Sequence, residues 1–206
     1  MEFADYLNVF KKNWILIVCS MIVLGSIAFI LTVRQPTTYQ ASAALEVNKQ
    51  QTVKQTDVSY YEYDNYYNVQ AAAAFSDNIV GWMSAPATVA EIFKSAGIDL
   101  PRGDLVSLSK IFTAKKSLAT SSVITIAYSS TDPDQAKKLI KTANEVMTNK
   151  ISQYNTADTS AKFTVVTSEP VVVVAPKQIT INTVIAVVVG LLLATGLAFA
   201  KESVKK

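Results

Sequence analysis

The sequence contains no histidine and a single cysteine, Cys19, among its 206 residues. Without histidine, it cannot build a Ser-His-Asp triad or an HExxH zinc site, and it lacks the commonest general base. Walker A, GxGxxG, GxSxG and CxxC motifs are also missing, so nucleotide-binding, hydrolase and redox sites lack their usual residues. We therefore expect no enzyme activity, no catalytic residue, no metal site and no cofactor.

Two pairs of carboxylates remain as candidates for acid–base chemistry, Glu62 with Asp64 and Asp132 with Asp134. Asp132 and Pro133 together have the features of a helix start, which explains the second pair by capping and by the helix dipole. Charge gives no sign of a nucleic-acid partner, because residues 34–178 carry 14 basic against 13 acidic side chains. We expect neither catalysis by these carboxylates nor nucleic-acid binding.

What the sequence does have is two long apolar runs. Residues 14–33, WILIVCSMIVLGSIAFILTV, are uncharged, and at about 1.5 Å per residue they would cross the ~30 Å hydrocarbon core of a membrane. Residues 179–200, ITINTVIAVVVGLLLATGLAFA, are similar in length and polarity. We interpret both as transmembrane helices. The first exceeds the roughly 7–15 apolar residues of a signal peptide and no clean A-x-A site follows it.

The basic residues that flank these runs predict the orientation in the membrane. Most of them lie on the terminal sides, and only Arg34 and Lys177 lie on the inner side of the runs. Basic residues favour the cytoplasmic side, so we expect a multi-pass protein of the bacterial plasma (inner) membrane with both termini cytoplasmic. The flanking basic residues of the terminal sides are Lys11, Lys12, Lys201, Lys205 and Lys206.

These features predict five segments. They are a cytoplasmic N-terminal segment (1–13), a first span (14–33), an extracytoplasmic α/β domain (34–178), a second span (179–200) and a cytoplasmic tail (201–206). The predicted fold class is α+β, with two transmembrane helices flanking one extracytoplasmic domain in which amphipathic helices pack on a small mixed sheet.

Within the domain, residues 39–47 are predicted to form a strand, and residues 69–85 and 87–96 to form two helices separated by Pro86. Between them, residues 49–68 are polar and hold five of the nine tyrosines, from Tyr60 to Tyr67. We expect this segment to be an irregular connection or an outer surface, with interface contacts or stacking on sugars as alternatives for its rings.

The second half of the domain has a clearer pattern. Residues 122–128, SVITIAY, alternate as a strand that we expect to be covered on both faces. An amphipathic helix should follow from Asp132 to Tyr154 and pack on the sheet. Residues 162–174 are β-rich and should return the chain beside the first strand. The stretch between residues 97 and 121 is turn-rich and gives no firm element.

Three stretches of the chain together resemble the Wzz-type chain-length determinants, or polysaccharide co-polymerases, and the related membrane adaptors of bacterial tyrosine kinases. The first is the entry YLNVFKKNWILIVCSMIVLGSIAFILTVRQPTTYQASAALEV. The second is VITIAYSSTDPDQAKKLIKTANEV, similar to a family strand followed by a D-P-x-x-A helix with an Ala-Asn pair. The third is EPVVVVAPKQ, before the second run. Residues that carry the motif helix are Asp132, Pro133, Ala136, Ala143 and Asn144, and Pro176 is the membrane-proximal proline.

The resemblance implies a non-enzymatic regulator of the chain length and assembly of a surface polysaccharide such as O-antigen, capsule or exopolysaccharide. Its short domain is similar to the compact members of the family. It would act as a homo-oligomeric scaffold in the lipid bilayer, with a polysaccharide polymerase, growing lipid-linked polysaccharide or a separate cytoplasmic tyrosine kinase as further partners.

Small residues in the second run are candidates for contacts between subunits, or they simply face lipid. These residues are Gly190, Ala194, Gly196 and Ala198. Two other functions are compatible with the sequence: a two-span sensory or ligand-binding membrane protein, and a structural subunit of an envelope export machine.

Overall fold

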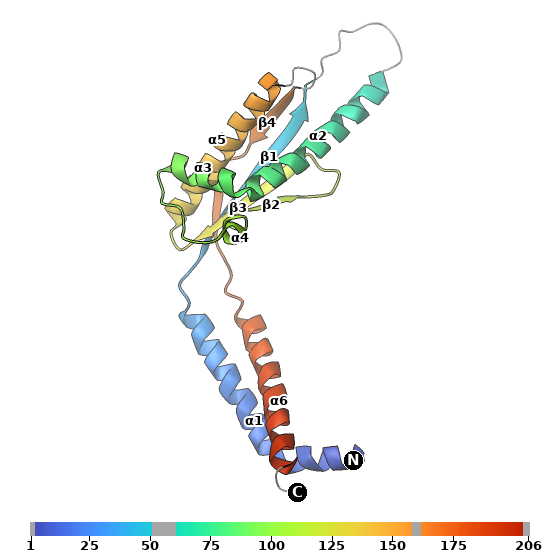
Figure 1. Cartoon of the computed structure of the whole chain (residues 1–206), viewed down its shortest axis with the longest axis vertical. Coiled ribbons are helices and arrows are strands. Elements are labelled where there is room, and N and C mark those ends of the chain that lie inside the picture. Colours follow the sequence, from blue (N-terminus) through green and yellow to red (C-terminus); the bar gives the residue numbers. More distant parts are fainter. Residues whose placement is uncertain (1–2, 51–60, 158–161, 204–206) are drawn as a thin grey trace. The chain divides into compact units, whose positions relative to one another are not determined.

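A computed structural model of the chain describes residues 3–50, 61–157 and 162–203. The chain divides into two compact units. One unit holds the two ends of the chain, residues 1–37 and 176–206, and the other holds residues 38–175 (Figure 1). Each unit has its own packing and is described separately.

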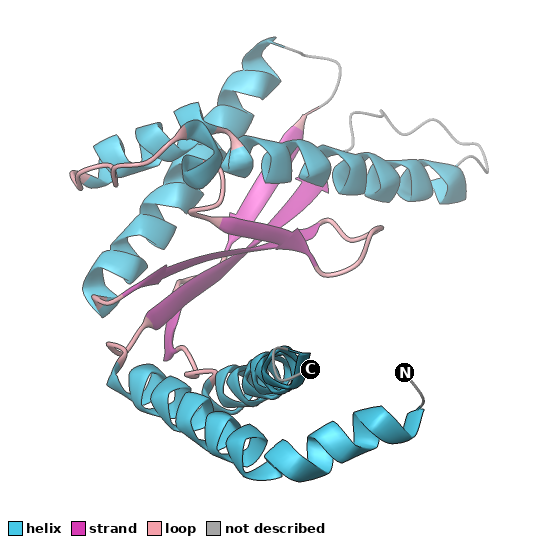
Figure 2. Ribbon diagram, turned by 60° about the horizontal axis from the view of Figure 1, so that its bottom comes forward, coloured by secondary structure: helices cyan, strands magenta, loops and turns pink. Residues whose placement is uncertain are grey.

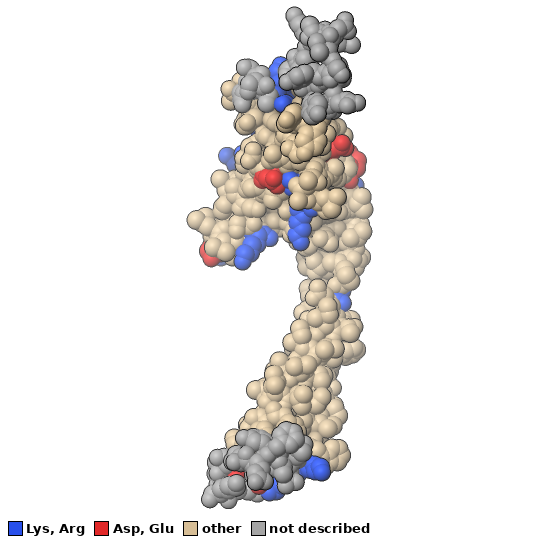
Figure 3. All heavy atoms as spheres, turned by 90° about the vertical axis from the view of Figure 1, so that its right-hand side faces the viewer, with Lys and Arg blue, Asp and Glu red and all other residues tan. Residues whose placement is uncertain are grey.

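The first unit consists of α1 (Phe3–Arg34) and α6 (Ile179–Ser203). Both are long and apolar enough to cross a membrane, over Val9–Arg34 and Ile179–Glu202. The helix pair presents an almost uncharged surface along most of its length (Figure 3). Helix α1 is interrupted at Asn13, where φ is −112° and ψ is 17°. The Asn13 amide donates a hydrogen bond to the Val9 carbonyl oxygen at 3.0 Å, a side-chain bond that competes with regular helix geometry.

Helices α1 and α6 run in opposite directions and are joined at both ends. At one end, Lys12 forms an ion pair with Glu202 at 2.8 Å. At the other end, the Lys177 ammonium donates to the Val33 carbonyl oxygen at 2.8 Å. Between these contacts, the Ser20 hydroxyl donates to the Gly190 carbonyl oxygen at 3.3 Å. The two helices therefore form an antiparallel pair with polar contacts along the seam between them.

The second unit is built on a five-stranded sheet with the order β2-β3-β1-β4, in which β5 also pairs with β1. The strands are β1 (Tyr39–Lys49), β2 (Thr113–Lys116), β3 (Val123–Ser130), β4 (Phe163–Thr167) and β5 (Val171–Val174). The α+β class is confirmed. The expected mixed sheet is corrected, because every strand pair in the described part of the chain is antiparallel.

The position of β1 explains the antiparallel pairing. Strands β3 and β4 are both antiparallel to β1 and so run in the same direction as each other. They are joined by α5 (Pro133–Ala157), the arrangement of a crossover connection. Strand β1 lies between them, so the two parallel strands never pair directly. This is a split β-α-β arrangement.

Within the second unit, the described helices cover one face of the sheet (Figure 2). Along β1, alternate residues from Ala41 to Val47 are buried, whereas Gln40, Glu46 and Asn48 are exposed. In β3, Ile124 and Ile126 are fully buried and Thr125 is exposed. The expectation that both faces of the second strand are covered is therefore wrong, because Val123 and Ala127 are only half-buried on the open face.

The covering helices are α2 (Tyr61–Ser84), α3 (Pro86–Ala96) and α5, with the short helix α4 (Leu105–Leu108) beside α3. Pro86, predicted to separate the two helices, is the first residue of α3, and Gly97 ends this helix with a left-handed φ of 65°, a conformation that favours glycine. Helix α2 starts at Tyr61, eight residues before the predicted helix. The segment before residue 69 contains no glycine or proline, so a helix nucleated by the alanine-rich stretch can extend through it.

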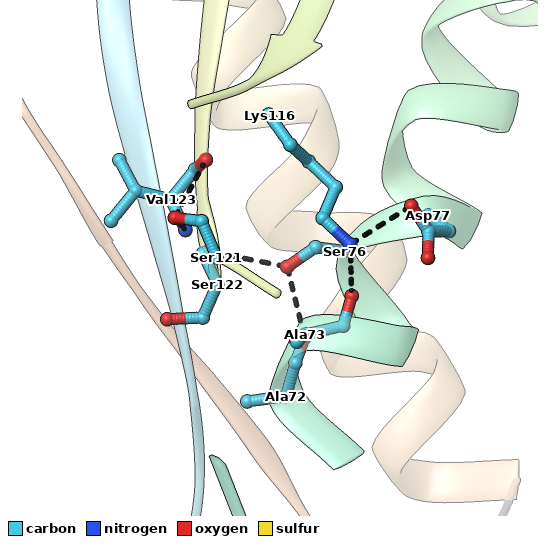
Figure 4. A network of polar contacts seen from close by, with 8 residues as sticks. All are labelled: Ala72, Ala73, Ser76, Asp77, Lys116, Ser121, Ser122 and Val123. Atoms are coloured by element: carbon cyan, nitrogen blue, oxygen red, sulfur yellow. Dashed lines mark hydrogen bonds and ion pairs between the residues drawn. The ribbon is translucent and has the colours of Figure 1, made fainter. Parts of the chain in front are cut away.

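A polar network attaches α2 to the sheet inside this layer (Figure 4). The Lys116 ammonium on β2 donates to the Ala73 carbonyl oxygen at 2.8 Å and to the Asp77 carboxylate at 3.0 Å. The Ser76 hydroxyl lies 3.2 Å from the Ser122 carbonyl oxygen. These contacts fix α2 across the edge of the sheet formed by β2 and the start of β3.

Candidate functional site

The described residues hold no group of three or more His, Cys, Asp or Glu side chains that could bind a metal ion. The Asp132 and Asp134 pair lies at the start of α5, where Asp132 acts as a helix cap. The side chains of Glu62 and Asp64 lie outside the described residues. The candidate site therefore consists of the motif residues of α5 and the segments that they contact.

The motif residues at the start of α5 set the position of that helix. The Asp132 carboxylate accepts hydrogen bonds from the backbone amides of Asp134 at 2.9 Å and Gln135 at 3.3 Å. Pro133 occupies the first helical position, where its missing N–H is not needed. The Ser130 hydroxyl at the end of β3 donates to the Gln135 side chain at 2.7 Å. The turn from β3 into α5 is thus fixed by its own side chains.

The other three motif residues lie on the face of α5 that packs on the sheet. Ala136 and Ala143 are fully buried in the main core, and their small side chains let the helix approach the strands closely. Asn144 is 6% exposed and its amide nitrogen donates to the Ser168 carbonyl oxygen at 3.3 Å. The motif therefore links β3, α5 and the segment between β4 and β5.

That segment interrupts the β-rich stretch that the sequence predicts as one strand. Ser168 forms two bonds with Ala44 of β1: its backbone amide donates to the Ala44 carbonyl oxygen, and its hydroxyl accepts from the Ala44 amide, both at 2.8 Å. Pro170 follows and has no N–H to donate. As a result, β4 and β5 pair with different parts of β1. No pattern in the sequence predicts the role of Ser168.

The two ends of the second unit leave it side by side. Tyr39 at the start of β1 pairs with Val174 at the end of β5, and the Ala175 amide donates to the Thr38 carbonyl oxygen at 2.8 Å. Pro176, the predicted membrane-proximal proline, follows directly and is exposed. Neighbouring exits agree with the expectation that the last strand lies beside the first.

The four small residues of the second run have different surroundings in the helix pair. Ala194 and Ala198 are buried, and a Cβ atom on Gly190 would lie 3.2 Å from the Met21 Cα atom of α1. Gly196 is exposed, and a Cβ atom there would have no neighbour within 4 Å. Three of the residues thus contact or approach α1 of the same chain. Contacts between subunits remain a prediction for all four.

Of the tyrosine cluster, the rings of Tyr66 and Tyr67 are described, and both are well exposed on α2. Their ring centroids lie 5.9 Å apart in an edge-to-face arrangement. Tyr60 and the side chains of Tyr61 and Tyr63 lie outside the described residues. Another tyrosine, Tyr128, is packed against Phe93 and Phe112, and burial raises the pKa of its phenol above the ordinary value.

A known protein family matches the first part of the chain. The model of the family described as Wzz, chain length determinant protein, matches residues 1–98. The resemblance to Wzz proteins is confirmed over that segment. It covers α1, β1, α2 and α3, so the likeness of the α5 motif and of the approach to α6 rests on their own residues. Comparison with curated proteins gives no match.

The Wzz match supports a chain length determinant role in polysaccharide assembly. With the two long apolar helices, it also indicates a membrane protein. The described chain thus consists of a helix-covered sheet whose two ends leave it side by side and a pair of antiparallel apolar helices.

Proposed function

We propose that this protein regulates the chain length of a surface polysaccharide as a non-enzymatic, homo-oligomeric scaffold in the bacterial plasma membrane. The observation that carries the proposal is the Wzz match over the first helix and the first half of the second unit. Supporting it are the family-like motif helix α5 and the pair of apolar helices at the two ends of the chain.

The expected topology places both termini in the cytoplasm and the second unit outside it. Basic residues on the terminal sides of the apolar helices support this orientation. A polysaccharide that is lengthened at the outer surface of this membrane would meet the second unit there. A polymerase, the lipid-linked polysaccharide itself and a separate cytoplasmic tyrosine kinase are the partners we propose.

The mechanism requires geometry rather than bond-making by this chain. Several copies standing side by side would present their sheets and helices as a repeated surface to the polymer and the polymerase. Growth would continue while the chain stays on this surface and end when it leaves. The open face of the sheet and the exposed valines of β4 and β5, such as Val166 and Val171, leave surface for neighbouring copies.

The test is an electrophoretic profile of surface polysaccharide from cells that lack the protein and from cells that express it again from a plasmid. We expect the wild-type cells to show a preferred chain length. On deletion, the distribution of lengths should become broad or short, and complementation should restore the preferred length. An unchanged profile would overturn the proposal and favour the sensory or structural alternatives. Immunodetection of the protein in the complemented cells is the control for expression.

A further inference from the structure

Helix α4 carries large apolar side chains at exposed positions. Leu105 is 70% exposed and Val106 is 59% exposed, and Leu100 in the preceding loop is 39% exposed. Leu108, in contrast, is only 9% exposed and attaches the helix to the rest of the second unit. Neighbouring apolar side chains that stay exposed mark a surface that contacts a partner or a membrane. Leu105 and Val106 therefore form an apolar edge of α4 that is open in the described part of the chain.

The packing of Phe112 shows at which end of the sheet α4 lies. Phe112 follows α4 closely, is buried, and has its ring centroid 5.3 Å from that of Tyr128. Tyr128 pairs with Ala41, near the start of β1. Figure 1 likewise shows α4 at the lower end of the second unit, where β1 begins. The apolar edge of α4 is therefore at the end of the sheet that also holds Tyr39.

This end of the sheet is joined to the apolar helices by two short links. Residues 35–38 separate α1 from β1, and residues 175–178 separate β5 from α6. Four extended residues cover at most about 14 Å. When α1 and α6 cross a membrane, as their length and composition allow, these links keep the start of β1 near the membrane surface. The apolar edge of α4 is then at the membrane-facing end of the second unit.

The charges around α4 are balanced. Asp99 and Arg102 precede the helix, Lys110 follows it, and Asp104 caps it by accepting from the Ser107 backbone amide at 2.8 Å. The four charged side chains are exposed. Apolar side chains next to charged ones suit the boundary between lipid headgroups and acyl chains. Because neither sign dominates, we expect contact with zwitterionic phospholipid, without the requirement for anionic lipid that a polybasic segment has.

We propose that the apolar edge of α4, Leu105 with Val106, inserts into the headgroup region of the membrane that α1 and α6 cross. The inference goes beyond the proposed function, since it depends on the two apolar helices crossing the membrane and not on a role in polysaccharide assembly. The two side chains would reach the boundary of the acyl chains, about 5–10 Å deep. This contact adds a third attachment to the two links and limits how far the second unit can tilt over the membrane.

The experiment is fluorescence quenching on the full-length chain in nanodiscs of zwitterionic phospholipid. In a Cys19→Ser background, an environment-sensitive dye is attached to Leu105→Cys or to Leu118→Cys. Leu118 is the matched control, because it is 71% exposed and follows the other end of β2. Nitroxide groups on the lipid headgroups should quench the Leu105→Cys dye about threefold or more over the Leu118→Cys dye, and iodide in the water should quench in the reverse order.

A second pair of variants removes the influence of the dye, which can enter a membrane by itself. The dye is attached to Ser107→Cys, an exposed position of α4, with Leu105 and Val106 either kept or both replaced by Gln. Because the apolar side chains would hold α4 at the membrane, the double replacement should lower lipid quenching about threefold. These replacements are at exposed positions, so circular dichroism should show the same helix content for both proteins.

Three results would overturn the proposal. The first is a Leu105→Cys dye that iodide quenches as strongly as the Leu118→Cys dye. The second is protection from iodide without quenching by the lipid nitroxides, which would mean that a second copy of the chain covers α4. The third is lipid quenching at Ser107→Cys that does not change when Leu105 and Val106 are replaced. The polysaccharide profile does not enter this test, so its outcome is independent of the proposed function.

Discussion

At the scale of single residues, a few polar side chains join segments that are distant in the sequence. Asn144 and Ser168 join α5 to the sheet, and Lys116 joins β2 to α2. Most of their partners are backbone groups of other segments, so the bonds depend on the fold as a whole rather than on local sequence.

Lys116→Met should destabilise the second unit. The Lys116 side chain is 10% exposed and its ammonium satisfies the Ala73 carbonyl oxygen and the Asp77 carboxylate. Loss of both bonds, with the apolar stem kept, should cost about 1–2 kcal/mol. Lys115→Met is the matched control, because Lys115 is exposed on the opposite face of the same strand, and it should cost less than about 0.5 kcal/mol. Thermal unfolding of the full chain in detergent measures both, and equal losses would contradict the account.

Tyr128→Phe should alter the response of the second unit to alkaline pH. Burial raises the pKa of the Tyr128 phenol above its ordinary value, so the folded state holds its proton more tightly than the unfolded state. The resulting stability is complete below pH about 10 and is lost as the pH rises through the folded pKa.

The melting temperature of the wild type should therefore fall more steeply above pH 10 than that of Tyr128→Phe. Thermal unfolding measured at intervals from pH 8 to pH 11 tests this. Tyr66→Phe replaces an exposed ring on α2 and serves as the control, with an alkaline response like that of the wild type. A Tyr128→Phe curve that is parallel to the wild-type curve would refute the explanation.

At the scale of elements, α1 and α6 pack at a seam that requires small side chains. A Cβ atom on Gly25 would lie 2.9 Å from a methyl group of Val187, and one on Gly190 would lie 3.2 Å from the Ser20 carbonyl oxygen. A flexible side chain can shift, whereas backbone cannot do so without moving the helix. Gly190 is therefore the stricter of the two positions.

Gly190→Leu should separate the two helices, because its side chain would meet the backbone of α1. We expect a loss of about 1–3 kcal/mol from overpacking, which corresponds to several degrees in the melting temperature in detergent. A Cβ atom on Gly196 of the same helix would have no neighbour within 4 Å. Gly196→Leu should therefore leave the melting temperature nearly unchanged. If Gly196→Leu instead disrupts assembly in the membrane, Gly196 is the better candidate for contacts between subunits.

The elements also show what can be predicted from the sequence. The alternation of residues 39–47, Pro86 between two helices, and Asp132 with Pro133 at a helix start depend on local geometry, and all correspond to the observed elements. The short strand β2 could not be predicted, since Thr113–Lys116 has no strand pattern and is defined by its pairing with β3. The one-sided sheet was missed because Val123 and Ala127 are apolar but face outward.

The residues of the candidate site were predictable only in part. The motif helix has a local signature in Asp132 and Pro133, whereas the contact between Asn144 and Ser168 does not. This contact joins residues 24 positions apart and depends on the break between β4 and β5. Contacts that depend on tertiary packing produce no periodic pattern in a single sequence, so they cannot be predicted from it.

At the scale of the whole molecule, the proposed topology can be tested with a thiol reagent. In a Cys19→Ser background, Lys94→Cys places a thiol at an exposed position of α3, and Lys201→Cys places one near the end of α6. A membrane-impermeant maleimide applied to spheroplasts should label the first variant and not the second. Both should be labelled after detergent lysis, which is the control. The reverse pattern in intact spheroplasts would contradict the proposed orientation.

The central claim is that chain length is set by the geometry of an assembled scaffold, and the most direct test varies the amount of protein. Polysaccharide profiles are recorded while an inducible promoter raises expression from zero to the wild-type level in the deletion strain. The geometry of one assembled scaffold does not depend on how many scaffolds a cell contains. We therefore predict that the preferred chain length stays constant, while the fraction of polysaccharide with that length grows with the amount of protein. A preferred length that shifts continuously with the amount of protein would contradict the account.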